Sequence, residues 1–131
     1  MEKKPVEIKN LKPGSYVIID EIPCVVEKLQ KSKAGKHGAA KARMMARGVF
    51  DPGVKKIIVR PGDTRMDSPV IEKKTAQVIS LTTDNAHLMD LVDYSTFEVK
   101  IPEEFRGQLT EGDEVTTWEF GHFKMIKGKK S

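Results

Sequence analysis

Short runs of apolar and β-branched residues alternate with turn-forming residues along most of the chain. In the first half, Lys12–Pro13–Gly14 precedes an apolar run, and the strands predicted there cover residues 16–20, 22–30 and 54–60. In the second half, the same pattern predicts strands at residues 75–82, 87–92, 96–101, 115–120 and 122–127. Only residues 102–107 favour a short helix there, because Pro102 precedes two acidic residues. The pattern therefore predicts an all-β chain built from hairpins.

The segment 39–47 fits two interpretations. Its Ala, Lys, Arg and Met residues have high helix propensity. However, a mostly apolar set of side chains alternates with a mostly basic set at a period of two, which is the period of a strand. We predict a strand, which would form a long hairpin with residues 22–30. Lys36 would lie near the tip of this hairpin, with basic side chains on its outer face.

Residues 61–69 contain few apolar residues and include two prolines, so we predict a linker there. The predicted domains are residues 1–69 and 70–131. Five strands and one short helix in the second domain suit a small barrel such as the OB-fold.

Charge is distributed unevenly between these domains. Residues 1–69 carry a net charge of +7 and residues 70–131 a net charge of −3. From Lys28 to Phe50 there are seven Lys and Arg residues and no Asp or Glu. OB-folds that bind single-stranded nucleic acid combine a positive groove with stacking aromatics. The second domain has the aromatics without the charge, so we expect them mainly in the barrel core.

Composition excludes several classes of protein. The single cysteine, Cys24, lies in an apolar run and is expected to be buried, and three histidines without ligand spacing argue against a metal site. No apolar run approaches the roughly 20 residues of a membrane span, and the N-terminus lacks the apolar segment of a secretory signal. We therefore expect a cytoplasmic protein without membrane association.

Lys36 stands between glycines in the sequence Gly35–Lys36–His37–Gly38. Glycines permit a tight, protruding backbone, which would present the lysine to an anion. A nucleotide-binding P-loop is excluded, because Gln30 stands where that motif needs glycine and His37 where it needs Ser or Thr. No nearby carboxylate could orient His37 for catalysis, so we expect no enzyme activity. The residues alone leave open a solvated basic hairpin and a contact with RNA or phosphate.

The stretch Ser32 to Lys41, SKAGKHGAAK, resembles the loop of the translation initiation factor 5A family, which is related to bacterial elongation factor P. Matching segments elsewhere extend the resemblance over essentially the whole chain; they include Leu11–Lys12–Pro13–Gly14, Gly48–Val49–Phe50 and Thr75–Ala76–Gln77–Val78–Ile79. Ala34 and Ala39 stand where eukaryotic members typically carry Thr and His, so the chain looks archaeal.

The resemblance implies an N-terminal SH3-like barrel followed by a C-terminal OB-fold barrel. It also implies that Lys36 is a substrate of deoxyhypusine synthase, which transfers an aminobutyl group from spermidine and leaves deoxyhypusine or, after hydroxylation, hypusine. The modification loop would comprise Ser32, Lys33, Gly35, His37 and Gly38. No cofactor is implied.

The same resemblance implies a monomeric factor at the E site of the ribosome. There the modified lysine would reach the acceptor end of the P-site tRNA and promote peptide-bond formation, notably at consecutive prolines, and termination. The residues expected to contact RNA phosphates are Lys33, Lys41, Arg43 and Arg47. The alternative is a general RNA-binding protein or RNA chaperone that uses the basic hairpin unmodified.

Overall fold

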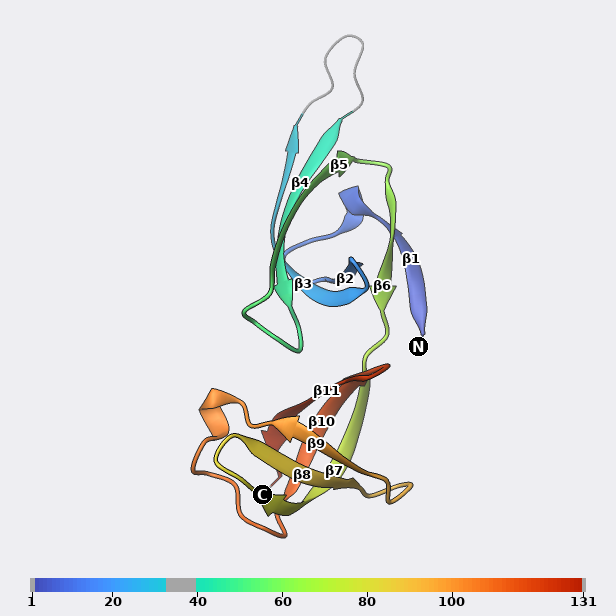
Figure 1. The fold of residues 1–131 in the computed structure, drawn as a ribbon. Helices are drawn as coiled ribbons and strands as arrows, with labels where there is room; N and C mark the ends of the chain where they lie inside the picture. Colours follow the sequence, from blue (N-terminus) through green and yellow to red (C-terminus); the bar gives the residue numbers. More distant parts are fainter. Residues whose placement is uncertain (1, 33–39, 131) are drawn as a thin grey trace. The chain divides into compact units, whose positions relative to one another are not determined.

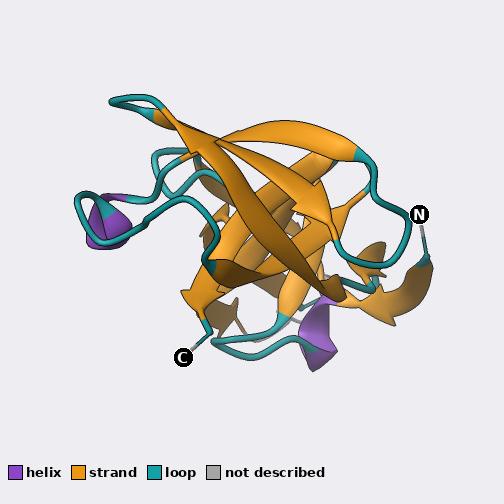
Figure 2. Cartoon of the chain, turned by 90° about the horizontal axis from the view of Figure 1, so that it is seen from below, coloured by secondary structure: helices purple, strands orange, loops and turns teal. Residues whose placement is uncertain are grey.

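The computed structural model describes residues 2–32 and 40–130, and the chain divides into two compact units, residues 1–70 and 71–131. Antiparallel strands make up most of both units (Figures 1 and 2). The described residues outside the strands form turns, loops and two short 3-10 helices. The prediction of an all-β chain is therefore confirmed.

The first unit contains six strands and the 3-10 helix η1. They are β1 (Lys3–Glu7), η1 (Ile8–Asn10), β2 (Tyr16–Ile19), β3 (Ile22–Ser32), β4 (Lys41–Gly48), β5 (Lys55–Pro61) and β6 (Arg65–Pro69). Strands β2, β3, β4 and β5 form a curved sheet in that order, and β1 pairs with β6. The sheet is a series of hairpins because each strand pairs with the next one along the chain.

The inner face of β4 explains why residues 39–47 form a strand despite their helix propensity. Ala42, Met44 and Ala46 are each no more than 1% exposed and pack with Ile8 and Val17 in the core of the first unit. Only a period of two places these three side chains on one face while the intervening basic residues stay in solvent. The strand prediction is confirmed, and burial of this face outweighs local propensity.

Residues 61–69 do not form the predicted linker. Residues 65–69 are strand β6, which pairs along its length with β1, from Glu7 opposite Arg65 to Lys3 opposite Pro69. Burial alternates along β6, with Met66 half-buried against the core and Arg65 exposed. The linker prediction was wrong because edge strands tolerate polar residues and proline when one row of side chains still faces the core.

The second unit contains five strands and the 3-10 helix η2. They are β7 (Glu72–Leu81), β8 (Asn85–Asp90), β9 (Thr96–Lys100), η2 (Glu103–Phe105), β10 (Glu114–Phe120) and β11 (Phe123–Lys129). The strands form one sheet in the order β11, β10, β7, β8, β9. The prediction of five strands and one short helix is confirmed, and the helix is a single 3-10 turn between β9 and β10.

The core of the second unit is mainly aliphatic, which differs from the expectation of an aromatic core. Its buried members are Ala76, Val78, Ala86, Leu88, Val99, Ile101, Val115 and Ile126. Phe97 and Phe105 only pack against this cluster, and Tyr94 is 68% exposed. An antiparallel barrel of short strands fills with branched aliphatic side chains, so several aromatics lie at its periphery.

The turn between β2 and β3 offers a test of backbone strain. Asp20 and Glu21 both have positive φ, 50° and 66°, which is a conformation that side chains with a Cβ adopt at a cost. Replacing Glu21 with glycine should raise the free energy of unfolding by about 0.5–1 kcal/mol, the strain relieved less the added entropy of the unfolded chain. Urea unfolding measures the change. Glu21→Ala keeps the Cβ, so stabilisation by this control would show that the side chain and not the backbone was responsible.

Candidate functional site

Strands β3 and β4 form a long hairpin that carries the predicted site. The ladder runs from Cys24 opposite Gly48 to Ser32 opposite Lys41, and the Ser32 hydroxyl donates a hydrogen bond to the Lys41 carbonyl at 3.3 Å. Lys36 follows Ser32 by four residues in the sequence and precedes Lys41 by five. The hairpin therefore brings together the two strand ends between which the glycine-framed lysine occurs.

Part of the predicted site lies outside the described residues. These predicted residues are Lys33, Gly35, Lys36, His37 and Gly38. Their assignment as a modification loop stays a prediction. The predicted residues that the structure does describe are Ser32, Lys41, Arg43 and Arg47, and all four lie on the β3–β4 hairpin.

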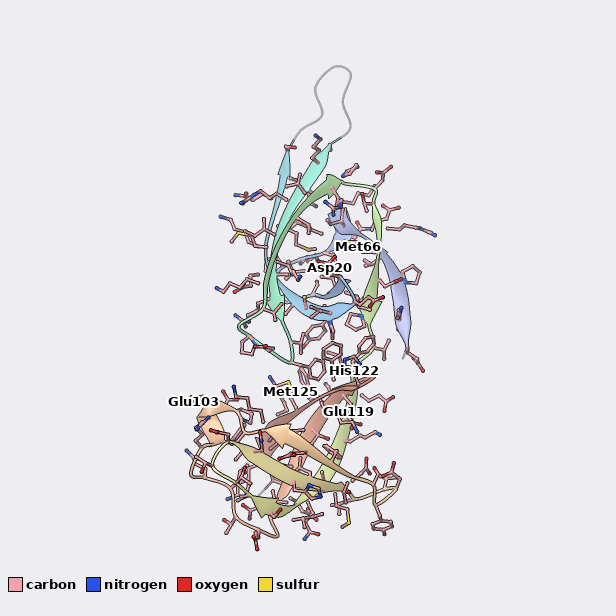
Figure 3. All side chains as sticks on the ribbon, viewed as in Figure 1. Asp20, Met66, Glu103, Glu119, His122 and Met125 are labelled. Carbon is pink, nitrogen blue, oxygen red and sulfur yellow. The ribbon has the colours of Figure 1, made fainter. Side chains whose placement is uncertain are left out.

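The basic side chains of β4 share its outer face. Lys41, Arg43 and Arg47 are exposed, and they alternate with the buried residues of the inner face. Figure 3 shows side chains that project outward from the β3–β4 hairpin. The strand periodicity thus concentrates positive charge on one side of the hairpin, as predicted.

Acidic residues compensate only the base of this hairpin. Arg47 pairs with Glu27, with Nη1 and Oε2 3.1 Å apart, next to a bulge in β3 between Val26 and Lys28. Within the described ranges, neither Lys41 nor Arg43 has an acidic partner within ion-pair distance. The uncompensated charge therefore lies toward the open end of the ladder, where its field acts on anions in solvent.

Strand β5 adds two exposed apolar side chains to the basic face, and the sequence did not predict their exposure. Met45 lies opposite Ile57 and Arg43 opposite Val59, so these residues share the outer face. Ile57 is 56% exposed and Val59 47% exposed. The apolar run 54–60 predicts a strand, but only its register with β4 shows that Ile57 and Val59 lie on the outer face of the sheet. Lys55 and Lys56, which precede Ile57 in the sequence, were the available signal.

Other polar groups of the first unit support structure. Lys56 pairs with Asp20, labelled in Figure 3, with Nζ and Oδ2 3.2 Å apart, which links β5 to the β2–β3 turn. Cys24 is fully buried, as predicted; its thiol donates to the Ile22 carbonyl at 3.3 Å, and burial raises the pKa of the thiol. A buried neutral thiol is a poor nucleophile. No three His, Cys, Asp or Glu residues of the described chain gather in a way that could hold a metal ion.

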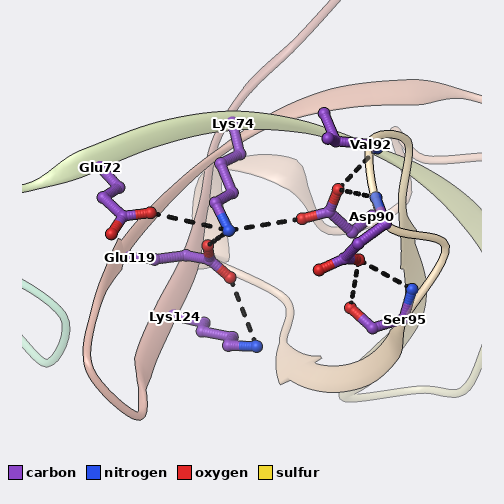
Figure 4. Close-up of polar contacts among 8 residues, drawn as sticks. Glu72, Lys74, Asp90, Val92, Ser95, Glu119 and Lys124 are labelled. Atoms are coloured by element: carbon purple, nitrogen blue, oxygen red, sulfur yellow. Dashed lines mark hydrogen bonds and ion pairs between the residues drawn. The ribbon is translucent and has the colours of Figure 1, made fainter.

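The second unit contains a cluster of ion pairs centred on Lys74, which we call the Lys74 cluster. Lys74 Nζ lies 3.0 Å from a Glu119 oxygen, and 3.6 Å from oxygens of both Asp90 and Glu72, while Lys124 approaches Glu119 at 3.3 Å (Figure 4). The hydrogen bond with Glu119 is the main reason that the pKa of Lys74 is raised to about 12. Asp90 and Glu119 are only 3% and 6% exposed, so the cluster neutralises two buried carboxylates.

Lysine side chains lie over two aromatic rings of the second unit. Trp118 has Lys73 Nζ 5.4 Å and Lys127 Nζ 4.5 Å from its ring, and Lys124 Nζ lies 4.3 Å from the Phe97 ring. These cation–π contacts already engage the lysines concerned. In the part of the chain that the structure describes, no helix has the length and apolar character needed to span a membrane.

Comparison with known proteins gives consistent matches over both units. Residues 2–58 match the family described as "Translation initiation factor 5A-like, N-terminal", and residues 70–128 match "Eukaryotic elongation factor 5A hypusine, DNA-binding OB fold". Translation initiation factor 5A of Thermofilum pendens is 48% identical over 130 residues, covering 97% of this chain and 98% of the relative. The factor of Methanocella arvoryzae is 52% identical over 113 residues, covering 86% and 88%.

A solved structure agrees with these relatives. "Eukaryotic translation initiation factor 5A from Methanococcus jannaschii" superposes with a TM-score of 0.84 at 38% identity, covering 98% of this chain and 95% of that chain. The predicted architecture of an SH3-like barrel followed by an OB-fold barrel is confirmed. The chain therefore belongs to the translation initiation factor 5A family, a family of translation factors and not of enzymes.

Proposed function

We propose that this chain acts on the ribosome through a modified Lys36. Deoxyhypusine synthase would transfer an aminobutyl group from spermidine to the lysine amine, giving deoxyhypusine or, after hydroxylation, hypusine. The longer side chain, with its second amine, would then reach the acceptor end of the P-site tRNA from the E site. There it would hold the tRNA in a productive geometry for peptide-bond formation, at consecutive prolines above all, and for termination. The proposal implies a cytoplasmic factor that works as a monomer.

The single observation that supports this proposal most directly is the geometry of the β3–β4 hairpin. A ladder of paired strands ends at Ser32 and Lys41, so both ends of the segment with the glycine-framed lysine are anchored to one sheet. That sheet is packed on the core of the first unit through Ala42, Met44 and Ala46. A reactive or binding group gains precision when rigid elements support it. The family description that includes the word hypusine adds support.

The outer face of the hairpin would supply affinity for RNA. Lys41 and Arg43 have no acidic partner in the described residues, so their charge is available to phosphates. Contacts of this type release counterions, so they depend strongly on salt and little on sequence. This suits a factor that positions one side chain on many different ribosomal complexes.

The test is a replacement of Lys36 by arginine, which keeps the positive charge and prevents aminobutyl transfer. We expect this variant to retain weak binding to ribosomes but to lose its stimulation of peptide-bond formation on stalling sequences. Intact-mass measurement of the protein from its native source should show the addition of one aminobutyl group to the wild type. Lys31→Arg, on strand β3 of the same hairpin, is the matched control and should keep both the added mass and the activity.

The alternative function, an unmodified RNA-binding protein or RNA chaperone, makes the opposite prediction. It is favoured by the exposed Ile57 and Val59 on a cationic face, a surface that unpaired bases could contact. If native protein carries no added mass and the Lys36→Arg variant remains fully active, the modified-lysine proposal fails and this alternative takes its place.

A further inference from the structure

The turn between β8 and β9, residues 91–95, presents two large apolar side chains to solvent. Val92 is 82% exposed and Tyr94 is 68% exposed, the highest values for large hydrophobic residues in the described chain. In Figure 1 this turn extends from the sheet of the second unit. Val92 and Tyr94 are separated by one residue of the same turn, and large exposed apolar side chains that occur together mark interaction surfaces.

Hydrogen bonds fix the shape of this turn. One carboxylate oxygen of Asp90 accepts from the amides of Val92 at 2.7 Å and Asp93 at 3.2 Å. The Tyr94 amide donates to the Asp90 carbonyl at 2.9 Å, and the Asp90 amide donates to the Ser95 carbonyl at 2.8 Å. Tyr94 has a φ of 61°, which is uncommon for an aromatic residue and needs support from the surrounding structure. The turn therefore holds its two exposed side chains in a defined arrangement before any partner binds.

The support for the turn continues into the barrel. Asp90 has one oxygen directed at the turn and the other 3.6 Å from Lys74 Nζ, so the same carboxylate belongs to the turn and to the Lys74 cluster (Figure 4). Because Asp90 is 3% exposed, it has little freedom to move. A preorganised surface loses less conformational entropy on binding, which raises affinity. The buried carboxylate of Asp90 therefore helps to keep the exposed β8–β9 turn rigid.

The charge of the turn indicates the chemistry of its partner. Asp93 accepts from the Ser95 amide at 2.9 Å and from the Ser95 hydroxyl at 2.6 Å, and these hydrogen bonds lower the pKa of Asp93. An aspartate carboxylate is ionised at neutral pH even without such a shift. An exposed anion between Val92 and Tyr94 repels phosphates and attracts Lys or Arg. The second half of the chain is also net acidic, at −3 for residues 70–131.

We propose that the β8–β9 turn docks into an apolar pocket, bordered by basic side chains, on a protein surface. Val92 and Tyr94 fill the pocket and Asp93 meets the cations at its rim. The inference rests on the proposed function, under which the docking partner is a protein of the ribosome. It assigns the second unit a separate task, which is to hold the factor by protein contact while the first unit meets RNA.

The test uses the full chain and purified archaeal ribosomes in a co-sedimentation assay. The double variant Val92→Ser/Tyr94→Asn removes both apolar groups, and asparagine suits the positive φ at residue 94, so the turn should still fold. We expect its affinity for ribosomes to fall by at least about tenfold, as for the loss of central interface anchors. Ile79→Ser is the matched control, because it removes another exposed apolar side chain from the second unit and should change affinity less than about twofold.

The sign of the Asp93 effect separates protein from RNA. Asp93→Asn keeps an acceptor oxygen for Ser95 and removes the charge. If the turn docks on a basic protein surface, this variant should bind ribosomes about two- to fivefold more weakly. If the turn contacts RNA, the variant should bind more tightly. A benzophenone amino acid in place of Val92 should cross-link to a ribosomal protein. Two outcomes would contradict the docking inference but leave the proposed function standing. They are cross-linking to rRNA, and unchanged affinity of the double variant when the wild type does bind. If the wild type does not sediment with ribosomes, the proposed function falls and the inference with it.

Discussion

Replacing Lys74 with methionine is expected to lower the free energy of unfolding by about 3 kcal/mol at neutral pH. The substitution keeps most of the side-chain volume but leaves Asp90 without a cation and leaves Glu119 with Lys124 only. Breaking a buried ion pair on one side costs about 3–5 kcal/mol, because the remaining charge is desolvated without compensation. The lower end of that range applies because 34% of the Lys74 side chain is exposed.

Lys73→Met is the matched control for this prediction. Lys73 is exposed on the opposite face of β7, with Nζ 5.4 Å from the Trp118 ring, so its loss should cost less than about 1 kcal/mol. Urea unfolding of both variants measures the two values. Equal effects of the two substitutions would show that the Lys74 cluster contributes no more than an exposed cation does.

The pH dependence of stability gives a second measurement on the same cluster. The pKa of Lys74 is raised from 10.5 to about 12 in the folded protein, mainly by its hydrogen bond with Glu119. A raised pKa contributes stability that is complete below pH 10.5 and is lost as the pH rises toward 12. The difference in stability between wild type and Lys74→Met should therefore narrow over this interval, and a constant difference would contradict the assignment.

Gly48→Ala is expected to cost about 2–3 kcal/mol of unfolding free energy. A Cβ at this position would lie 2.5 Å from the carbonyl oxygen of Asp51 and 3.3 Å from the Cβ of Val54. The carbonyl cannot move away freely because it accepts a hydrogen bond from the Val54 amide at 3.0 Å. Relieving the clash requires either a shift of the loop after β4 or the loss of that hydrogen bond.

Gly53→Ala tests the same loop without the clash. A Cβ there meets only Asp51 Oδ1, at 3.2 Å. This oxygen accepts a hydrogen bond from the Gly53 amide at 3.0 Å, but a shift of the side chain by a few tenths of an ångström relieves the contact without breaking that bond. We expect its urea midpoint to stay near that of the wild type. If Gly48→Ala unfolds at the wild-type midpoint as well, the close approach to Asp51 does not constrain the loop.

The sequence predicts those parts of the structure that follow from local periodicity. Alternation along β4 identified its buried and basic faces, and the turn residues identified most of the hairpins. Strand β6 was missed because its evidence lies in pairing with β1, some 60 residues away, and not in its own polar sequence. The exposure of Ile57 was missed for a related reason, since the face of the sheet on which its side chain lies is set by the pairing of β5 with β4.

In the candidate sites too, the sequence predicts what depends on local pattern but not what depends on contacts between strands. The basic character of Lys41, Arg43 and Arg47 was predictable from composition and period, whereas the compensation of Arg47 by Glu27 depends on a bulge in the hairpin. The role of Asp90 could not be predicted at all. It joins a local turn to Lys74, a partner on a neighbouring strand, and only the folded sheet brings these groups together.

Strand β5 has a consequence for the behaviour of the protein in concentrated solution. At the edge of its sheet it pairs with β4 on one side only, and a strand edge with exposed Ile57 and Val59 is a template for aggregation. Lys55, Lys56 and the terminal Arg60–Pro61 counter this, because two identical strands would bring like charges together and proline has no amide to donate. The cations that make this surface attractive to a polyanion thus also keep copies of the chain apart.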